Sequence, residues 1–550
     1  MSYGTVRRWV LATAVVGLIG ASPGIAAGAP SADQQVKFAD QSTPITRLTA
    51  AIHMTKDNRA SARAFTGPTV MLANPSNPRI VVAATAELRT RVCYLLRSND
   101  AGLSWHILPA LPARPTYPYC TTADNAGSTQ AAIAWGRDNT LYYALGAYGA
   151  GEGDKAAHTS IVLARSTDLG NSWTTTLVDN NRGKTGVAPT DSGVTGLAVD
   201  TSGPRDAVYV GFMQSYPDAP KDSHLQDGKV IVAVSTDGGT TFDHSADINT
   251  FSHVTQTIEG VTVPLQMMTY FGGPFLLAHN GVIEAISGPQ TPFDAPKLPG
   301  TSFHAMPELV ARSTDQGRTW AVSTLGPPIF TGTGSQTGLG WSPLGGPKGT
   351  FTATYAATPE SATSSGSANV VFQRSTDLGE TWSDPVVLND DDPTQQFTHF
   401  YPQLGVAPNG RVDIVWETNR DQHDYHFQTM YTYSTDGGAT WAHNVQVSDR
   451  PINFGLGVSF NSDIRQPPGV ASANQYAAFG WADTRLGNDT TQTQDDFAVV
   501  AQFAPLPAKG STVLPVVAAV FGGLALAGII LVLALLIRRR RQVPEPAVVG

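Results

Sequence analysis

The fold of this chain is decided by a nine-residue stretch, Arg97-Ser98-Asn99-Asp100-Ala101-Gly102-Leu103-Ser104-Trp105. Five further segments repeat its order of serine, aspartate, glycine and a terminal aromatic residue. They are Arg165–Trp173, Val234–Phe242, Arg312–Trp320, Arg374–Trp382 and Tyr433–Trp441. Successive aspartates are 68, 69, 78, 62 and 59 residues apart, and six copies at such quasi-regular spacing indicate a repeat architecture.

Each residue type of the repeat suits a tight turn between two β-strands. Aspartate and serine side chains can accept hydrogen bonds from nearby backbone N–H groups. Glycine supplies the positive φ of a bulged hairpin, and the terminal ring buries apolar surface beside the strands. We therefore interpret the repeat residues as structural rather than catalytic or calcium-binding. They are Asp100, Gly102, Trp105, Asp168, Gly170, Trp173, Asp237, Gly239, Phe242, Asp315, Gly317, Trp320, Asp377, Gly379, Trp382, Asp436, Gly438 and Trp441.

These segments resemble the Asp-box (bacterial neuraminidase) repeats of sialidases, sortilin-type receptors and many secreted bacterial propellers. The resemblance covers about Phe65–Phe503, which is most of the chain. It implies an all-β fold, a β-propeller of four-stranded blades. In that family each box joins the third strand of a blade to the fourth, on the rim and away from the active site.

The strands that precede each box also occur a seventh time, ending in Phe497–Phe503, where no box follows. A last blade of three strands needs a fourth from elsewhere. The N-terminal stretch Val36–Ile52, with Val36–Phe38 and Ile45–Leu48 as strand candidates, would close the ring and cover the exposed edge. Seven blades are therefore favoured, with six as the alternative.

The two ends of the chain predict export and membrane anchoring. Arg7 and Arg8, the apolar run after them and the small residues that follow are typical of a signal peptide, exported by the Sec or the twin-arginine route. Val513–Ile537 has 25 residues without a charge, which is long enough to cross a bilayer, and Arg538–Arg541 predict a cytoplasmic tail. The predicted organisation is a signal peptide (1–29), an N-terminal segment with a closing strand (30–64), the propeller (65–503), a linker (504–512), a transmembrane helix (513–537) and the tail (538–550).

The charge of the chain limits the macromolecules that it can bind, and its cysteines and acidic runs bear on disulfide and metal binding. Residues 30–503 hold 28 basic and 43 acidic residues, and this acidity disfavours nucleic acid and anionic lipid as partners. Cys93 and Cys120 predict a disulfide in an exported protein, with metal binding as the alternative. The acidic runs Asp390–Asp392 and Asp495–Asp496 are expected to be solvated, with calcium binding as the alternative. No metal or cofactor is expected, because no His-x-x-x-His or Cys-x-x-Cys spacing occurs.

The resemblance also implies one specific activity. Sialidases of this family bind the substrate carboxylate with three arginines and use an aspartate acid/base and a tyrosine nucleophile that is activated by glutamate. The nearest match to their Arg-Ile-Pro element is Arg79-Ile80-Val81, which has proline before the arginine rather than after the isoleucine and is expected on a second strand rather than on the innermost one. The next candidate from an inner strand is Asp463-Ile464-Arg465. Catalytic residues therefore stay unknown and enzyme activity stays undecided.

Two second-strand ends carry a carboxylate and an arginine beside a tryptophan. The first pair is Glu417 with Arg420, and the second is Asp483 with Arg485. We interpret both as exposed pairs that tie loops, each worth at most about 1 kcal/mol. A site at the mouth of the central channel is the alternative.

The longest loops are expected to leave second strands on one face of the propeller. They are Gly146–Thr159, Gln214–Gly228, Gly288–Ala305 and Asn419–Phe427. Such loops often form ligand surfaces. Their aromatic and histidine residues are Tyr148, His158, Tyr216, His224, Phe293, His304, His423, Tyr425 and His426. The sequence thus predicts a membrane-anchored, extracytoplasmic binding or scaffold propeller with a carbohydrate or protein ligand on this face. The alternative is an exo-α-sialidase or other glycoside hydrolase.

Overall fold

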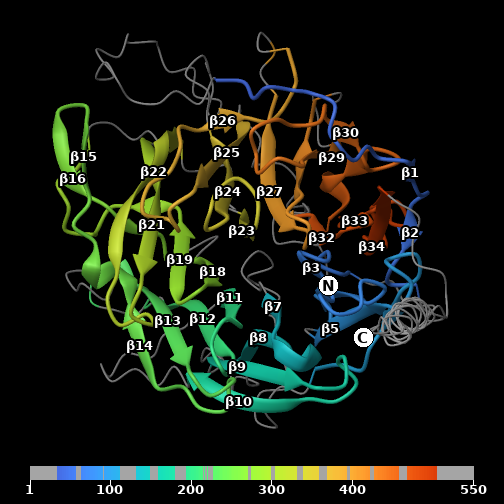
Figure 1. The fold of residues 1–550 in the computed structure, drawn as a ribbon, viewed down its shortest axis with the longest axis horizontal. Coiled ribbons are helices and arrows are strands. Elements are labelled where there is room, and N and C mark those ends of the chain that lie inside the picture. Colours follow the sequence, from blue (N-terminus) through green and yellow to red (C-terminus); the bar gives the residue numbers. More distant parts are fainter. Residues whose placement is uncertain are drawn as a thin grey trace, which may run out of the picture.

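The described residues form a ring of seven antiparallel sheets (Figure 1). Each innermost strand contacts the innermost strands of the two neighbouring blades, so the ring is closed. The fold is an all-β, seven-bladed β-propeller, as the sequence favoured. This computed structural model describes residues 34–56, 64–90, 92–111, 120, 132–148, 159–179, 194–214, 216, 220, 227–269, 274–298, 304–330, 338–357, 368–392, 395, 397–420, 426–457 and 467–503.

Blades one to six each contain four strands, which follow one another from the innermost outward. Blade one has β3 (Val70–Ala73), β4 (Val81–Glu87), β5 (Val92–Ser98) and β6 (His106–Ile107). Blade two has β7 (Ala132–Trp135), β8 (Leu141–Tyr148), β9 (Thr159–Ser166) and β10 (Thr174–Asp179). Blade three has β11 (Val194–Asp200), β12 (Ala207–Gln214), β13 (Lys229–Ser235) and β14 (His244–Asp247).

The same order continues in the second half of the ring. Blade four has β18 (Phe275–His279), β19 (Val282–Ser287), β21 (Ala305–Ser313) and β22 (Ala321–Phe330). Blade five has β23 (Gly338–Ser342), β24 (Thr350–Ala357), β25 (Asn369–Ser375) and β26 (Val386–Val387). Blade six has β27 (His399–Val406), β28 (Val412–Thr418), β29 (His426–Ser434) and β30 (Val445–Gln446), with β31 (Ile452–Asn453) also on β29.

A few short elements lie outside this pattern. A hairpin, β15 (Thr255–Ile258) and β16 (Val261–Pro264), projects from the disc beside blade four (Figure 1), and β17 (Gln266–Met267) pairs with β20 (Pro289–Gln290). The described 3₁₀-helices are η1 (Arg137–Asn139), η3 (Ile248–Phe251) and η4 (Phe454–Leu456).

Blade seven takes its outermost strand from the other end of the chain. Its inner strands are β32 (Gly469–Ala473), β33 (Tyr476–Asp483) and β34 (Asp495–Gln502). β1 (Arg47–Leu48) and β2 (Ile52–His53) pair with β34 in antiparallel fashion. Backbone hydrogen bonds between the two ends of the propeller therefore close the ring and remove an open sheet edge.

The first N-terminal strand candidate, Val36–Phe38, does not lie on blade seven. Gln35 forms a parallel bridge to Val387 in β26, and Phe38 forms one to Trp441, just before β30. This segment therefore covers the outer edges of blades five and six. β26 and β30 have only two residues each. The segment therefore supplies backbone hydrogen-bond partners along outer edges that these short strands would otherwise leave open.

All six repeated segments form a turn between the third and fourth strands of a blade, and we call these the repeat turns. In each, the serine hydroxyl accepts a hydrogen bond from the glycine N–H at 2.8–2.9 Å. The aspartate accepts one from a serine or threonine hydroxyl at 2.5–2.7 Å. The glycines have φ between 76° and 88°, where a side chain would be strained. Every aspartate of the repeat thus stabilises its own turn.

The repeat turns also join neighbouring blades. A Cβ placed on Gly170 would lie 2.6 Å from the Leu95 side chain of the preceding blade, which is too close for any real contact. Arg97 Nη1 of that blade donates a hydrogen bond to Leu169 O at 2.9 Å. The corresponding arginines of blades four and five make the same kind of contact with the next turn. The glycine is therefore required by packing as well as by φ.

The disc has two distinct faces. The repeat turns and the connections between first and second strands lie on one side, which we call the turn face. Because successive strands are antiparallel, the connections between second and third strands and those between blades lie on the opposite side, the long-loop face.

The predicted disulfide is present. Cys93 in β5 is bonded to Cys120, and their Cα atoms are 5.7 Å apart, within the usual range. The predicted signal peptide (1–29) and the apolar run Val513–Ile537 lie outside the described residues. Within those residues, no helix is both long and apolar enough to cross a membrane.

Candidate functional site

Of the nine residues to which the sequence assigned ligand contact, four have described side chains, in segments on the long-loop face: Tyr216, Phe293, His304 and His426. Phe293, between β19 and β21, is 39% exposed. Tyr216 is buried and donates a hydrogen bond to Gln214 Oε1 at 2.9 Å. His304 Nδ1 lies 4.0 Å from the Glu259 carboxylate. The side chains outside the described part of the chain are those of Tyr148, His158, His224, His423 and Tyr425.

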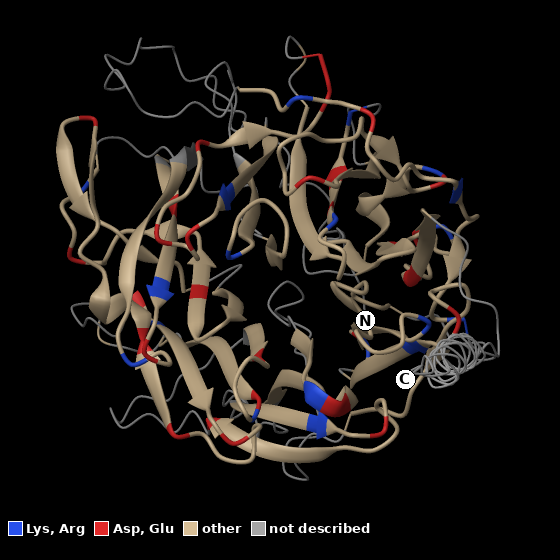
Figure 2. Cartoon of the chain, viewed as in Figure 1, with Lys and Arg blue, Asp and Glu red and all other residues tan. Residues whose placement is uncertain are grey.

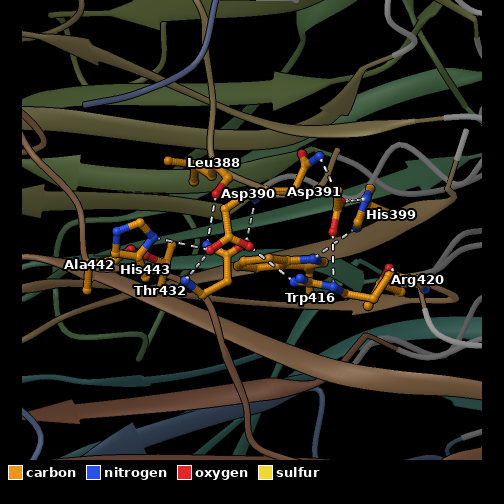
Figure 3. Close-up of polar contacts among 12 residues, drawn as sticks. Leu388, Asp390, Asp391, His399, Trp416, Arg420, Thr432, Ala442 and His443 are labelled. Atoms are coloured by element: carbon orange, nitrogen blue, oxygen red, sulfur yellow. Dashed lines mark hydrogen bonds and ion pairs between the residues drawn. The ribbon is translucent and has the colours of Figure 1, made fainter. Parts of the chain in front are cut away.

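A polar cluster joins blade five to blade six on this face (Figure 3). Asp390 and Asp391 follow β26, the outermost strand of blade five, and Arg420 follows β28, the second strand of blade six. Arg420 Nη1 lies 3.1 Å from Asp390 Oδ1, and Arg420 Nε lies 3.1 Å from Asp391 Oδ1. One guanidinium therefore bridges two adjacent carboxylates and ties the two blades together.

His399, the first residue of β27, connects this cluster to the core. Trp416 Nε1 lies 3.2 Å from His399 Nδ1, and an indole N–H can only donate, so Nδ1 must accept. The ring proton is therefore on Nε2, which lies 2.5 Å from Asp391 Oδ2. His399 is 2% exposed and Asp391 is 5% exposed, so this pair is sealed from solvent.

The partners of Asp391 keep its carboxyl ionised. Burial is the largest single influence and on its own would raise the pKa of Asp391. The hydrogen bond from His399, the charge of Arg420 and the hydrogen bond from Asn389 together lower that pKa below its usual value. The expectation that the run Asp390–Asp392 is solvated is therefore wrong for its first two residues, which form ion pairs.

Glu417 lies next to Trp416 on β28 and is fully buried. Its Oε1 accepts a hydrogen bond from Thr429 Oγ1 at 3.1 Å, whereas Oε2 has no hydrogen-bond partner among the described residues. Burial raises the pKa of Glu417 to about 8, and the charge of Asp483 in blade seven contributes to the rise. Glu417 is thus protonated at neutral pH and forms no ion pair with Arg420, contrary to the sequence interpretation.

A corresponding cluster joins blade six to blade seven. Arg485 Nη2 lies 2.6 Å from Asp449 Oδ1 and 2.7 Å from Asp483 Oδ2. Trp481 Nε1 donates a hydrogen bond to Asp483 Oδ2 at 3.0 Å. The guanidinium also stacks over the Phe497 ring at 4.1 Å. Because Asp483 is 1% exposed, this pair is not an exposed loop contact either.

A third arginine of this kind was missed by sequence reasoning. Arg89 follows β4 of blade one, and its Nη2 donates hydrogen bonds to Thr491 O at 2.6 Å and Gln492 O at 3.2 Å in blade seven. The signal was in the sequence, because Glu87-Leu88-Arg89 has the same spacing as Asp483-Thr484-Arg485. Three successive blade junctions around the point of ring closure therefore carry an arginine contact of this type.

The second acidic run is also buried rather than solvated. Asp496 on β34 is fully buried, and burial raises its pKa to about 8. Asp495 Oδ1 lies 3.4 Å from His53 Nε2 and accepts a hydrogen bond from Thr55 Oγ1 at 3.1 Å. Across the described ranges, no group of three His, Cys, Asp or Glu residues is arranged to hold a metal ion.

The innermost strands offer no arginine for a sialidase-like site. Over its described length this ring of strands contains no Arg, Lys or Glu, and Figure 2 shows the charged residues mostly away from it. Glycines bring these strands close together: a Cβ on Gly340 would lie 2.5 Å from Leu404 of blade six. Arg79 precedes β4 in a connection on the turn face and is not on the second strand itself. Asp463–Arg465 lies outside the described residues.

The reachable part of the blade five–six cluster is small. Arg420 is 27% exposed and Asp390 is 18% exposed. His399 and Glu417 are the groups that could transfer a proton. Both are buried, whereas general acid–base catalysis requires a group within reach of the substrate. The arrangement can stiffen this face and present a paired guanidinium and carboxylate to a ligand.

The fold defines the chain as a seven-bladed β-propeller. Comparison with known proteins does not assign it to a narrower family. No protein family and no curated protein matches the sequence. A PL25 ulvan lyase shares 12% identity over 82% of this chain and 95% of its own, with a TM-score of 0.43. The GH93 α-L-arabinofuranosidase of Fusarium graminearum shares 13% over 67% and 92% (TM-score 0.40). Trypanosoma rangeli sialidase shares 13% over 68% and 54% (TM-score 0.38). At these values the likenesses assign no activity to this chain.

Proposed function

We propose that this chain is an exported β-propeller, held at the cell membrane by Val513–Ile537, that binds a carbohydrate or protein ligand through its long-loop face. The observation that carries the choice of binding over catalysis is the innermost ring of strands, which lacks Arg, Lys and Glu over its described length. A site that recognises an anionic sugar from the central channel needs guanidinium groups there.

Two further features support this proposal. The Cys93–Cys120 disulfide fits an oxidising compartment outside the cytoplasm. The six repeat turns have the hydrogen bonding and the place in the blade that Asp-boxes would have, and we assign them to that class. Such turns hold neighbouring blades together, so that the opposite face is free to differ from blade to blade.

The alternative function is a glycoside hydrolase, and one observation favours it. Glu417 keeps its proton at neutral pH, which a general acid on a glycosidic oxygen must do. Its carboxyl is fully buried, however, so substrate could reach it only if the face opened. Binding without turnover therefore remains the proposal.

A glycan array and a fluorogenic sialoside, both offered to the purified full-length protein in detergent, test the proposal together. We expect binding without turnover. Leu486→Asp on the long-loop face should weaken binding about tenfold, as loss of an exposed apolar contact can do. Leu103→Asp, the matched change on the turn face, should leave binding unchanged. Turnover of the sialoside, or equal effects of the two variants, would contradict the proposal.

A further inference from the structure

The chain leaves the propeller at a defined position on the turn face. β34 runs from the long-loop face to the turn face, and its last residue, Gln502, lies opposite Tyr476, the first residue of β33. In blade six the same position belongs to Ser434, which lies opposite Val412 and opens the repeat turn. The chain therefore leaves blade seven where a repeat turn would otherwise begin.

The residue at this exit is held firmly in the fold. Phe503 N donates a hydrogen bond at 2.8 Å to Gln475 O, which lies in the β32–β33 connection on the turn face. The Phe503 ring packs edge-on against Tyr433 with the centroids 5.0 Å apart, and Arg411 Cζ lies 3.8 Å from its centroid. Because Phe503 is buried by these contacts, the fold determines the face from which the chain departs.

We infer that the propeller is displayed with its turn face toward the membrane and its long-loop face away from it. This inference rests on the proposed anchor at Val513–Ile537. Between Phe503 and Val513 the sequence has only residues 504–512, which reach about 30 Å when fully extended.

A reversed orientation does not fit this reach. A strand of the length of β34 crosses the disc over roughly 26 Å at about 3.3 Å per residue. A linker that started on the turn face and passed around the rim would use most of its length on that crossing alone. The long-loop face could then lie against the bilayer only if the linker had almost no lateral distance to cover.

The orientation determines which molecules can reach the long-loop face. A long-loop face that points away from the bilayer meets glycans or proteins of the surroundings, not components of its own membrane. The ligand is therefore a soluble or opposing-surface molecule.

Energy transfer to the membrane tests the orientation in the full-length protein. Three exposed residues serve as labelling positions: Leu103 (39% exposed) in a repeat turn, and Leu486 (53%) and Phe293 (39%) on the long-loop face. Leu103→Cys, Leu486→Cys and Phe293→Cys are labelled with a membrane-impermeant donor, without reductant, in vesicles that contain an acceptor lipid. Two positions from separate blades of one face distinguish a tilted disc from an inverted one.

We expect transfer to be at least twofold stronger from position 103 than from either long-loop position. Equal transfer from all three, or stronger transfer from 486 or 293, would overturn the orientation while the anchor stands. Failure of the protein to float with the vesicles would overturn the anchor itself, and with it the orientation. Flotation with transfer strongest at 103 supports both.

Discussion

In blade six and in blade seven, an arginine that follows the second strand forms an ion pair with an aspartate of the preceding blade. The two aspartates occupy equivalent positions. Arg420 meets Asp390, and Arg485 meets Asp449. Each of these aspartates lies just beyond the outermost strand of the preceding blade. The contact is therefore the same at both junctions and belongs to the architecture of the ring.

The second partner differs between the two junctions. In blade seven the buried Asp483 accepts from both Trp481 and Arg485. The equivalent residue of blade six is Thr418, and there the tryptophan reaches an acid only through the His399 ring and Asp391. In blade seven, one carboxylate accepts hydrogen bonds from both the tryptophan and the arginine. In blade six, the tryptophan donates to His399, and Asp391 contacts both His399 and Arg420.

The two junctions show which residues can replace one another. Both of these junctions combine a guanidinium, a carboxylate and a hydrogen-bonded indole N–H, but the acceptor of the indole N–H comes from a different position in each. Of these two junctions, the one between blades five and six includes an imidazole, that of His399, and the other does not. This variation marks the long-loop face as the side on which the blades diverge.

The largest expected effect comes from removing the carboxylate that serves two donors. Asp483→Ala leaves the indole N–H of Trp481 and the guanidinium of Arg485 without their buried acceptor, and this should cost about 3–5 kcal/mol of unfolding free energy. Denaturant unfolding of the purified protein measures it. Asp449→Ala is the matched control, since Asp449 is 37% exposed, and it should cost under about 1 kcal/mol. Equal losses would mean that burial does not distinguish the two acids.

A pH dependence comes next, from the acid that blade six carries beside its tryptophan. Burial raises the pKa of Glu417 from 4.5 to about 8, so the folded state keeps a proton that the unfolded state releases. Stability from this group is therefore fully present below pH 4.5 and falls as pH rises toward 8, at a slope on the order of 1 kcal/mol per pH unit. Glu417→Gln should flatten this part of the stability profile.

Blade seven offers the matched test of that slope. Its residue equivalent to Glu417 is Ala482, and its buried acid lies instead on the neighbouring strand, at Asp496, whose pKa burial also raises to about 8. Asp496→Asn should flatten the profile in the same direction. Thermal unfolding from pH 5 to pH 9 measures both, and an unchanged profile in both variants would show that neither group holds a proton in the fold.

Much of the fold could be predicted because its signals are local. The repeat turns depend on hydrogen bonds within a few residues, so their sequence shows both their number and their place between strands. The location of Val36–Phe38 could not be predicted in this way. It depends on how short β26 and β30 are, which is decided by packing between blades and not by the segment itself.

The candidate site was visible only in part for a related reason. Arg420 and Arg485 stand out by their repetition, but the raised pKa of Glu417 depends in part on the charge of Asp483 in the neighbouring blade seven. His399 and Asp391 are close in sequence, yet their contact crosses a blade boundary that a sequence does not mark. Pairs that bridge two repeats need the order of the blades before they can be recognised.

A smaller effect is expected from the hydrogen bond between His399 and Trp416 in blade six. His399→Ala and Trp416→Phe each remove one side of the Nε1–Nδ1 hydrogen bond. In a double-mutant cycle by denaturant unfolding we expect a coupling of about 1–2 kcal/mol, because each single change leaves a buried polar partner unsatisfied. Additive effects would show that the imidazole fills space without relaying the contact to Asp391.

The smallest effect is expected at the rim of the same cluster. His443 Nδ1 lies 3.5 Å from Asp390 Oδ2, but His443 is 76% exposed and stacks on Phe38 of the N-terminal segment. His443→Ala should therefore change the unfolding free energy by under about 0.5 kcal/mol, since exposed pairs contribute little. Asp390 would keep Arg420 and the Asn444 N–H as partners. A loss above about 1 kcal/mol would mean that the N-terminal segment, through Phe38, stabilises the junction more than its exposed position indicates.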